Sequence, residues 1–457
     1  MSIQIETDIL VIGAGLTGLT TAFYLNKAGK NFMVAEVKPV AGGVIQTIEQ
    51  DGFIFEKGPN TGVLGNDLAV ELFDDLGEAC QLEIAGKSVN KRYILKDGRW
   101  EALPSGVLGG IVTPLFTFAD KLRLLGEPFR KPGTNPNETL AELVRRRMGK
   151  SFLDYAVDPF ILGVYAGDPT YIVPKYALPK LYNLEQKYGS FIGGSVKQAR
   201  EKKKLGIVSR ATREIFSVKG GLSNLTKALY QSAGESKFLL GISDLSVQPV
   251  HGGFVVVGVD ADKNEMIVKA KKVISTVGAH RLKTMMNFLP EEFYKPIVNL
   301  QYAKVVQVSL GFKQWDGMKL DGFGGLIPHK ENRQVLGVLF PSAFFPDRAP
   351  EGGAMLSVFM GGVRRPDIYD MPDEEIRRIV DKEIKSLMGL KEFNPDIFHI
   401  SRYKHAIPQY GADCAERFDA VEKAQEKYPG LIIAGNLRNG IGMADRIQQG
   451  RQLADAV

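Results

Sequence analysis

The sequence predicts a mixed α/β (α+β) protein in which both ends of the chain build one domain and the middle is inserted into it. Two observations predict the shared domain. A strand, a glycine-rich turn and a helix follow one another near the N-terminus, and the same order recurs near the C-terminus. The third observation is the length of 457 residues. A chain of this length is too long to fold around one small hydrophobic core, which predicts two or three lobes.

The N-terminal segment "TDILVIGAGLTGLTTAFYLNKAGKNFMVAEV" has a strand–turn–helix–strand pattern. Residues 9–12 form a short apolar run, residues 19–25 follow a helical pattern, and residues 31–35 form a second strand before Glu36. Between the first strand and the helix lie Gly13, Gly15 and Gly18. This context predicts a Rossmann-like dinucleotide-binding turn rather than an ordinary turn of small residues.

Each residue of the turn has a physical role. Gly13 makes the tight turn, Gly15 lets backbone N–H groups approach a pyrophosphate, and Gly18 lets helix and strand pack closely. The N-terminus of the helix faces the phosphates. Glu36 accepts hydrogen bonds from ribose hydroxyls, and an acid at this position argues against a 2′-phosphate.

Two further segments favour FAD over NAD. The pair Gly42 and Gly43 follows Glu36 and precedes a predicted hairpin through "GFIFEKGPN". Near the C-terminus, "GLIIAGN" predicts a strand, and "NGIGMADRIQQGRQLADAV" a glycine loop that opens a helix facing the flavin pyrimidine ring. Alone, this segment fits an ordinary strand–loop–helix unit equally well. Its candidate cofactor contacts are Gly435, Asn436, Gly440, Ile441, Gly442 and Met443.

The composition limits the classes of binding partner and the cellular compartment that we expect. A net charge of +6 favours anionic ligands or an anionic membrane surface, but it is too weak to predict nucleic-acid binding. Cys80 and Cys414 lie far apart without metal spacing, which predicts a reducing compartment. Glu6 and Asp8 interrupt the N-terminus, so no signal peptide is predicted and a cytoplasmic location is expected.

Two apolar stretches are irregular. The uncharged run 102–119, "ALPSGVLGGIVTPLFTFA", is broken by prolines and glycines, which predicts a surface loop or cavity wall rather than a membrane span. The stretch 158–169, "DPFILGVYAGDP", has glycines that interrupt a helical stripe. From the residues alone it is expected to be buried and irregular.

No catalytic side chain is predicted. The sequence has five histidines, and none of them belongs to a Ser/His/Asp or metal-like cluster. They are His251, His280, His329, His399 and His405. We therefore predict no metal site and no essential side-chain base, with His329 and His405 interpreted as surface or structural residues.

Several motifs together resemble the protoporphyrinogen/coproporphyrinogen oxidase family, within the wider flavin amine-oxidase fold. They extend from residue 8 to the C-terminus and include "GAGLTGL", "GFIFEKGPNT", "NKRYILKDGRWEALPSG", "DPFILGVYAGDP", "LPKLYNLEQKYGSFIGG", "VKGGLSNL", "GFGGLIP", "RYKHAIPQYG" and "AGNLRNGIGMADRI". Two residues depart from the family pattern. Val44 replaces a frequent basic residue, and Arg446 replaces a frequent cysteine.

The resemblance implies three parts. They are a discontinuous FAD-binding domain (1–87, 206–275 and 395–457), a helical membrane-binding and cavity domain (88–205), and a substrate-binding domain with a mixed sheet (276–394). Gly58, Pro59 and Val247 join the implied cofactor contacts. The stretch 158–169 would then line a path for a flat apolar macrocycle.

The implied reaction is the oxidation of protoporphyrinogen IX to protoporphyrin IX, the penultimate step of haem biosynthesis. Three hydride transfers to flavin N5 would occur, with O2 as acceptor and H2O2 released. Alternatives are the oxidation of coproporphyrinogen III to coproporphyrin III, a flavin amine oxidase, or a non-enzymatic GTPase chaperone with this fold. Implied partners are the porphyrinogen, O2 and a membrane surface, with ferrochelatase or a second copy of the chain also suggested.

Four residues are the implied substrate contacts. Arg92 would pair with a propionate, although a solvated strand-edge arginine is the alternative reading of this lysine- and arginine-rich segment. Gly324, Leu326 and Phe359 would form apolar walls around a pyrrole, with plain sheet core as the alternative for Phe359. Peripheral membrane attachment is expected from "GVLGGIVTPLFTF" and its basic neighbours, Lys121, Arg123, Arg130 and Lys131.

Overall fold

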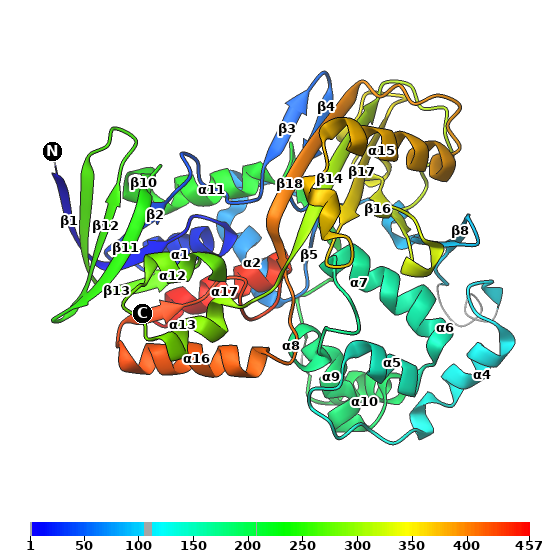
Figure 1. Cartoon of the computed structure of the whole chain (residues 1–457), viewed down its shortest axis with the longest axis horizontal. Coiled ribbons are helices and arrows are strands. Elements are labelled where there is room, and N and C mark those ends of the chain that lie inside the picture. The colour runs from blue at the N-terminus through cyan, green and yellow to red at the C-terminus, as the bar shows by residue number, and fades with distance from the viewer. Residues whose placement is uncertain (1, 105–111, 207) are drawn as a thin grey trace.

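The structure is a computed structural model that describes residues 2–104, 112–206 and 208–457. It has three lobes: a lobe that contains both chain ends, a lobe built on a second sheet, and a helical lobe (Figure 1). This arrangement agrees with a mixed α/β protein whose middle segments are inserted between the two ends of the chain.

The first lobe contains a seven-stranded sheet with strand order β10-β2-β1-β13-β12-β11, and β19 also pairs with β13. The pairs made by β1, β2, β10 and β19 are parallel, whereas β11, β12 and β13 form an antiparallel meander. The strand bounds are β1 (Ser2–Ile12), β2 (Phe32–Glu36), β10 (Phe238–Leu240), β11 (Ser243–Val250), β12 (Gly253–Val259), β13 (Glu265–Ser275) and β19 (Leu431–Ile433).

Helices cover both faces of this sheet because successive strand residues point to opposite sides. Ile9 and Val11 pack in one buried cluster with α1 (Leu16–Lys27), α2 (Asp67–Leu76), α11 (Ser223–Ala233) and α17 (Met443–Asp455). Leu10 and Ile12 pack in the other, with the meander and α12 (Leu282–Met285), α13 (Glu291–Val298) and α16 (Cys414–Lys427). The predicted N- and C-terminal units therefore share one core.

The second lobe contains a mixed sheet with strand order β18-β14-β17-β16-β15-β7-β8. Helix α15 (Asp373–Met388) covers its apolar face, to which β14 contributes Val306, Val308 and Leu310. The strands are β7 (Tyr93–Lys96), β8 (Arg99–Ala102), β14 (Tyr302–Phe312), β15 (Gly324–Leu326), β16 (Val335–Leu339), β17 (Ala354–Gly361) and β18 (Ile397–Pro408). A short helix, α14 (Pro341–Phe344), follows β16.

The lobes differ from the expected domain boundaries at three places. β7 and β8 belong to the second sheet, although 88–205 was expected to be helical. β18 also belongs to it, although 395–457 was expected to be part of the cofactor domain. Conversely, α12 and α13 pack into the first lobe. The reason is pairing: strands distant in sequence complete the edges of the second sheet, and no local pattern specifies which sheet a strand joins.

The helical lobe packs around a small apolar cluster that includes Leu140, Val144, Ile161 and Phe191. Its helices are α4 (Phe118–Leu125), α5 (Leu140–Arg147), α6 (Lys150–Phe152), α7 (Asp158–Tyr165), α8 (Pro174–Ala177), α9 (Pro179–Tyr188) and α10 (Phe191–Lys204). No helix among the described residues is long and apolar enough to cross a membrane. Residues 105–111 of the predicted apolar loop lie outside the described residues.

The stretch 158–169 differs from the expectation of an irregular segment, because most of it is helix α7. Gly163 does not break the helix. A Cβ at this position would overlap the side chain of Leu326 in β15, so the glycine permits helix and sheet to approach. Arg364 holds both ends of the stretch, through Asp158 Oδ1 at 2.6 Å and Asp168 Oδ2 at 2.8 Å.

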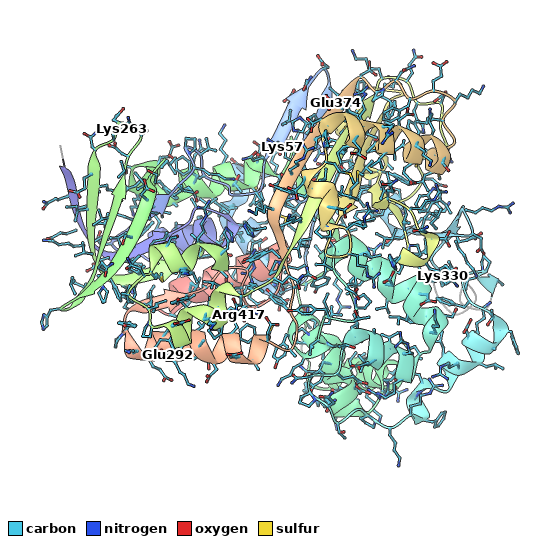
Figure 2. The ribbon with its side chains drawn as sticks, in the orientation of Figure 1. Lys57, Lys263, Glu292, Lys330, Glu374 and Arg417 are labelled. Carbon is cyan, nitrogen blue, oxygen red and sulfur yellow. The ribbon has the colours of Figure 1, made fainter. Side chains whose placement is uncertain are left out.

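A hairpin joins the first lobe to the second sheet. It consists of β3 (Thr47–Gln50) and β4 (Phe53–Glu56), as predicted after the glycine pair. Lys57 follows β4 and lies beside β18 (Figure 2), where its carbonyl oxygen accepts a hydrogen bond from the Tyr403 hydroxyl. A small sheet of order β5-β9-β6 is formed by β5 (Gly62–Val63), β6 (Leu82–Ile84) and β9 (Ile215–Val218).

Candidate functional site

The turn between β1 and α1 has the predicted geometry. Gly13 has φ = +103°, a backbone conformation that favours glycine, and its N–H donates to Ala35 O at 2.8 Å. A Cβ at Gly18 would overlap the carbonyl oxygen of Gly13. The two glycines therefore serve the tight turn and the close packing of helix against strand.

The neighbourhood of Gly15 fits an approaching phosphate. Gly15 precedes the first turn of α1 and makes no side-chain cap, and a Cβ added to it would meet no described atom within 4 Å. The first N–H groups of an α-helix lack intrahelical partners and attract anions. A Cβ on Gly43 would lie 3.0 Å from the Cα of Gly15, so the glycine pair packs beside this turn. The absence of side chains at both positions leaves the backbone of this turn open to a ligand.

Glu36 ends β2 beside the turn. Its carboxylate accepts hydrogen bonds from the backbone N–H groups of Ala14 at 2.6 Å and Lys38 at 2.9 Å. The same loop is closed by Gly42 N–H, which donates to Ala14 O at 2.8 Å. Because each carboxylate oxygen can accept more than one hydrogen bond, Glu36 retains capacity for ribose hydroxyls.

The C-terminal loop lies between β19 and α17 and is held by two tyrosines. Gly435 and Gly440 have φ of +92° and +90°. The Tyr410 hydroxyl contacts the carbonyl oxygens of Asn436 at 2.7 Å and Gly440 at 3.1 Å, and the Tyr302 hydroxyl contacts Asn436 Oδ1 at 3.2 Å. Tyr302 begins β14 of the second sheet, and Tyr410 lies two residues after the end of β18, the strand paired with β14. The predicted flavin loop is thus fastened to the lobe predicted to bind substrate.

The second sheet has one polar but buried face, opposite α15. Its serines and glutamine are almost fully enclosed: Gln307 is 2% exposed and Ser357 is 0% exposed. Gln307 Nε2 donates to Glu56 O at 2.8 Å, and Ser357 Oγ donates to Asn60 Oδ1 at 2.7 Å. These bonds hold the segment containing Gly58 and Pro59 against the same face as Phe359, which is two residues after Ser357 in β17.

The predicted substrate contacts share that face. In the ladder Leu326 lies opposite Gly337, and Gly337 lies opposite Phe359, so all three point to one side of the sheet. Two strand spacings separate the aliphatic and aromatic side chains, about 10 Å between backbones. Gly324 has φ = +148°, and a Cβ there would overlap Val338 O. Gly324 therefore serves the strand conformation, and Leu326 and Phe359 provide the apolar surface.

Arg92 precedes β7 and is exposed. Its guanidinium lies 5.5 Å from the centroid of the Phe323 ring. Its neighbours are engaged, since Lys91 pairs with Asp321 at 2.8 Å and Lys96 donates to Pro114 O at 2.7 Å. Arg92 has no carboxylate partner among the described residues, so its charge is available for an anionic ligand.

Val247 lies in β11, and its side chain is fully buried with Val256 and Met266 in the core of the first lobe. Only its backbone can therefore contact a ligand. Ile441 is partly buried against the helical lobe, and Met443 begins α17, whose preceding residue Gly442 donates its N–H to Asp445 Oδ2 at 3.1 Å.

Sequence reasoning missed the residues that connect these parts. They are Tyr302, Tyr410, Gln307, Ser357 and Asn60. Two of them are within quoted motifs, Asn60 in "GFIFEKGPNT" and Tyr410 in "RYKHAIPQYG". A buried polar position in a strand pattern is the signal that could have identified Gln307 and Ser357.

Two titratable groups have unusual surroundings. Burial raises the pKa of Glu56 to about 7, although Leu222 N–H and the Thr47 hydroxyl donate to its carboxylate at 2.7 and 2.8 Å. His280 and His405 stack with ring centroids 3.8 Å apart, and burial, followed by the charge of His405, lowers the pKa of His280 to about 4. Glu56 caps the N-terminus of α11 through Leu222, so its contacts are those of a structural group.

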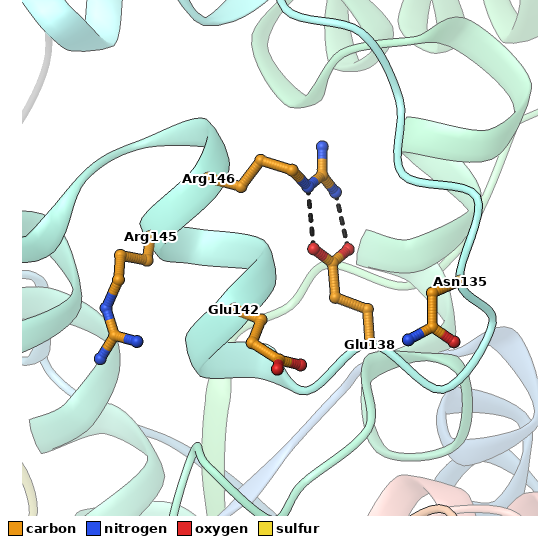
Figure 3. Close-up of a pocket in the computed structure, with 5 residues that line it drawn as sticks. All are labelled: Asn135, Glu138, Glu142, Arg145 and Arg146. Atoms are coloured by element: carbon orange, nitrogen blue, oxygen red, sulfur yellow. Dashed lines mark hydrogen bonds and ion pairs between the residues drawn. The ribbon is translucent and has the colours of Figure 1, made fainter.

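A separate surface hollow of about 520 Å³ lies on α5 in the helical lobe (Figure 3). Three of its lining residues have structural partners: Arg146 pairs twice with Glu138, at 2.7 and 2.8 Å, and Glu142 caps the helix through Thr139. The other lining residues are Asn135 and Arg145. None of the predicted cofactor or substrate residues contributes to this hollow.

Comparisons with known proteins agree with this assembly. Residues 16–457 match the family described as flavin containing amine oxidoreductase. The chain is 30% identical to mitochondrial protoporphyrinogen oxidase of Nicotiana tabacum, over 98% of this chain and 94% of that protein. It is 26% identical to coproporphyrinogen III oxidase of Bacillus subtilis (strain 168), over 98% of this chain and 97% of that protein.

A solved structure from Exiguobacterium sp. 255-15 superposes with a TM-score of 0.82 at 21% identity, over 99% of this chain and 98% of that one. At this level of identity the superposition concerns the fold alone. The chain and its neighbour therefore share all three lobes, whereas the assignment to a family rests on the sequence matches.

Proposed function

Because the chain belongs to the family of flavin-containing amine oxidoreductases, and is thus an FAD-dependent oxidoreductase, we propose that it oxidises protoporphyrinogen IX to protoporphyrin IX with O2 as acceptor. The name of the tobacco relative, which matches almost full length against full length, supports this substrate. The single structural observation that supports it most is the face of the second sheet that Leu326 and Phe359 share, because the hydrogen bond from Ser357 to Asn60 holds the segment containing Gly58 and Pro59 against this face at β17.

In this proposal the cofactor binds across the first lobe. The α1 N-terminus with Gly13, Gly15 and Gly18 would hold the pyrophosphate, and Glu36 a ribose. The glycine pair, Gly58 and Pro59, the backbone of Val247 and the loop from Gly435 to Met443 would hold the remainder. When bound, FAD supplies a two-electron acceptor that O2 can reoxidise. The protein then has to orient the macrocycle, a role for which rigid strands are well suited.

The propionates need a cation, and Arg92 is the proposed partner. Its guanidinium has no carboxylate partner among the described residues, whereas Lys91 pairs with Asp321 and Lys96 donates to the carbonyl oxygen of Pro114. A bidentate guanidinium suits a carboxylate. Coproporphyrinogen III, the substrate named for the B. subtilis relative, has two more propionates and would require further free cations near Arg92.

The proposed division of the chain follows the lobes. A cofactor domain is formed by the chain ends and 206–275, a substrate domain by the second sheet including β7, β8 and β18, and a cavity domain by the helices α4–α10. Helix α7 supplies the wall opposite the sheet, because Gly163 admits the Leu326 side chain. Ala166 at the end of α7 packs with Phe359 in a further apolar cluster.

The test is a side-by-side turnover measurement of the purified flavoprotein with protoporphyrinogen IX, coproporphyrinogen III and an alkyl diamine. Porphyrin fluorescence and peroxide release are followed together. The proposal expects the highest kcat/KM with protoporphyrinogen IX. Preference for coproporphyrinogen III would transfer the assignment to that substrate, and oxidation of the diamine alone would make the protein an amine oxidase.

We also propose that α4 attaches the protein to an anionic bilayer. Phe118, Leu122 and Leu125 lie at helical spacing and are 75%, 52% and 72% exposed, and Phe129 just after the helix is 90% exposed. Figure 1 places α4 at the outer edge of the helical lobe. Basic residues accompany them, as anionic headgroups require. In contrast to the expectation, Leu115 and Phe116 are buried with Ile94 and do not reach the surface.

Flotation with phosphatidylglycerol vesicles tests this attachment. Phe118→Ser combined with Leu125→Ser should remove most of the bound fraction, whereas Val250→Ser, a change at a 48%-exposed apolar residue of β11, should not. Equal flotation of all three proteins would exclude α4 as the attachment surface.

A further inference from the structure

Arg446 is a buried cation without an acidic partner. It lies in the first turns of α17 and is 8% exposed. Its guanidinium donates to three neutral oxygens: Gln449 Oε1 at 2.8 Å, Arg438 O at 2.9 Å and Asn439 O at 2.8 Å. No ion pair is formed to it within the described part of the chain, and its Nε–H has no acceptor there.

Burying such a charge costs free energy of desolvation unless a nearby anion or hydrogen-bond acceptors compensate for it. An arginine stays protonated in proteins, so it cannot avoid the cost of burial by losing its charge. Burial lowers the pKa of Arg446, while Tyr410 and Asp445 oppose the shift. The Asp445 carboxylate accepts from Gly442 N–H at 3.1 Å and forms no ion pair with Arg446. The positive field of Arg446 is therefore not cancelled by a contacting anion among the described residues.

The position of this charge is informative. The carbonyl groups of Arg438 and Asn439 immediately precede Gly440, and Asn439 is in the left-handed region at φ = +67°. Arg446 thus holds the turn that presents Gly440–Met443. Gln449, which accepts from Arg446, also accepts from Gly435 N–H at 2.9 Å, so both ends of the loop depend on this pair. The N-terminus of α17 adds partial positive charge at the same place.

We propose that Arg446 raises the reduction potential of the bound flavin, because its uncompensated charge stabilises the negative charge of the reduced pyrimidine ring. The inference rests on the proposed placement of FAD against Gly440–Met443. Charges interact strongly where protein excludes water, so a guanidinium at the base of this loop favours the reduced cofactor. A purely structural Arg446 would instead affect how tightly FAD is bound in both oxidation states.

The test compares Arg446→Met, Arg446→Lys and the matched control Arg438→Met, all as purified holoproteins. Arg438 is in the same loop, but its side chain is 23% exposed and reaches Glu422 at 3.7 Å. Midpoint potentials are measured by dye-coupled spectroelectrochemistry, and FAD content is measured separately by absorbance after release.

Arg446→Met should shift the equilibrium toward oxidised flavin by at least tenfold, about 30 mV for a two-electron couple. Arg446→Lys should recover at least half of that shift, and Arg438→Met should match the unmodified protein. Equal potentials in the methionine and lysine variants would overturn the proposal, whatever their FAD affinity. If Arg446→Met does not fold, Arg446→Gln replaces it in the same comparison. A colourless unmodified protein would instead contradict the placement of FAD itself.

Discussion

Ser357 and Asn60 lie 297 residues apart in the sequence and share a hydrogen bond of 2.7 Å in the buried space between the second sheet and the first lobe. Together with the bond from Gln307 to Glu56 O, it fixes the segment containing Gly58 and Pro59 beside the face of Phe359. The proposed cofactor and substrate contacts thus meet at a polar seam, and the geometry of the site depends on that seam.

Ser357→Ala tests the seam. It leaves Asn60 Oδ1 buried without its donor, which should lower the free energy of unfolding by ~1–3 kcal/mol. FAD affinity should fall too, since Gly58 and Pro59 lose a tether. Urea unfolding and FAD titration measure both. Ser209→Ala, which removes an exposed hydrogen bond to Asp67, should stay within ~0.5 kcal/mol of the unmodified protein. Equal effects of the two changes would contradict a special role for Ser357.

Gly15→Val should impair FAD binding, whereas Gly18→Ala should impair the stability of the fold. A side chain at Gly15 has free space in the protein itself, so Gly15→Val should fold and lose FAD by occupying the proposed position of the pyrophosphate. A Cβ at Gly18 would overlap Gly13 O, so Gly18→Ala should destabilise the fold. Circular dichroism and flavin absorbance separate the two. A yellow Gly15→Val protein with full FAD occupancy would show that the diphosphate lies elsewhere.

Arg92→Ala should lower kcat/KM for the porphyrinogen by about 10- to 100-fold, because a charge-assisted hydrogen bond is worth ~1.5–3 kcal/mol. Arg92→Lys should recover only part of it, since an ammonium lacks the paired geometry. Lys91→Ala is the matched control, because Lys91 is already paired with Asp321. Flavin content should remain constant in all three. Unchanged kinetics of Arg92→Ala would make Arg92 a solvated strand residue.

The pKa of Glu56, raised to about 7 by burial, predicts a pH dependence of stability. The folded protein favours the protonated acid. The contribution of Glu56 to the free energy of unfolding is therefore fully present below the unfolded pKa of ~4.3. It is lost as pH rises to about 7, and the free energy of unfolding falls by up to ~3 kcal/mol. Urea unfolding of FAD-saturated protein at pH 5 to 8 measures it.

Glu56→Gln should remove this pH dependence and be relatively more stable at pH 8, since an amide does not ionise. Glu49→Gln, an exposed change on the same hairpin, should follow the unmodified protein at each pH. Parallel stability curves for Glu56→Gln and the unmodified protein would show that Glu56 does not titrate in this range.

Arg147 is 0% exposed and contacts Glu127 and Glu185, which are 0% and 1% exposed, inside the helical lobe. Arg147→Met leaves the buried carboxylate of Glu127 without its cation and Glu185 with Arg146 alone, and should cost ~3–5 kcal/mol. Arg145→Met, two positions earlier on the exposed side of α5, should cost less than ~0.5 kcal/mol. Thermal unfolding compares them. Similar melting temperatures would mean that the cluster is not required for the stability of this lobe.

The local elements of the cofactor lobe were predictable because short-range geometry decides them. Gly13 must adopt a left-handed conformation and Gly18 must lack a side chain, and both requirements arise within one strand–turn–helix unit. The helix after Gly442 and the hairpin after Gly43 follow from equally local patterns. For α7 the local pattern misled, because the close approach of Leu326 explains Gly163 and that contact is invisible in sequence.

By itself, the sequence determined a flavin-type dinucleotide turn, a shared domain of the two chain ends and a family resemblance, since these depend on residue identities at fixed spacing. Only the tertiary structure decided which strands complete the second sheet, that Ser357 donates a hydrogen bond to Asn60, and that Arg446 is buried without an acidic partner among the described residues. These relationships depend on packing and desolvation in three dimensions, where the partner of a buried polar group can lie hundreds of residues away.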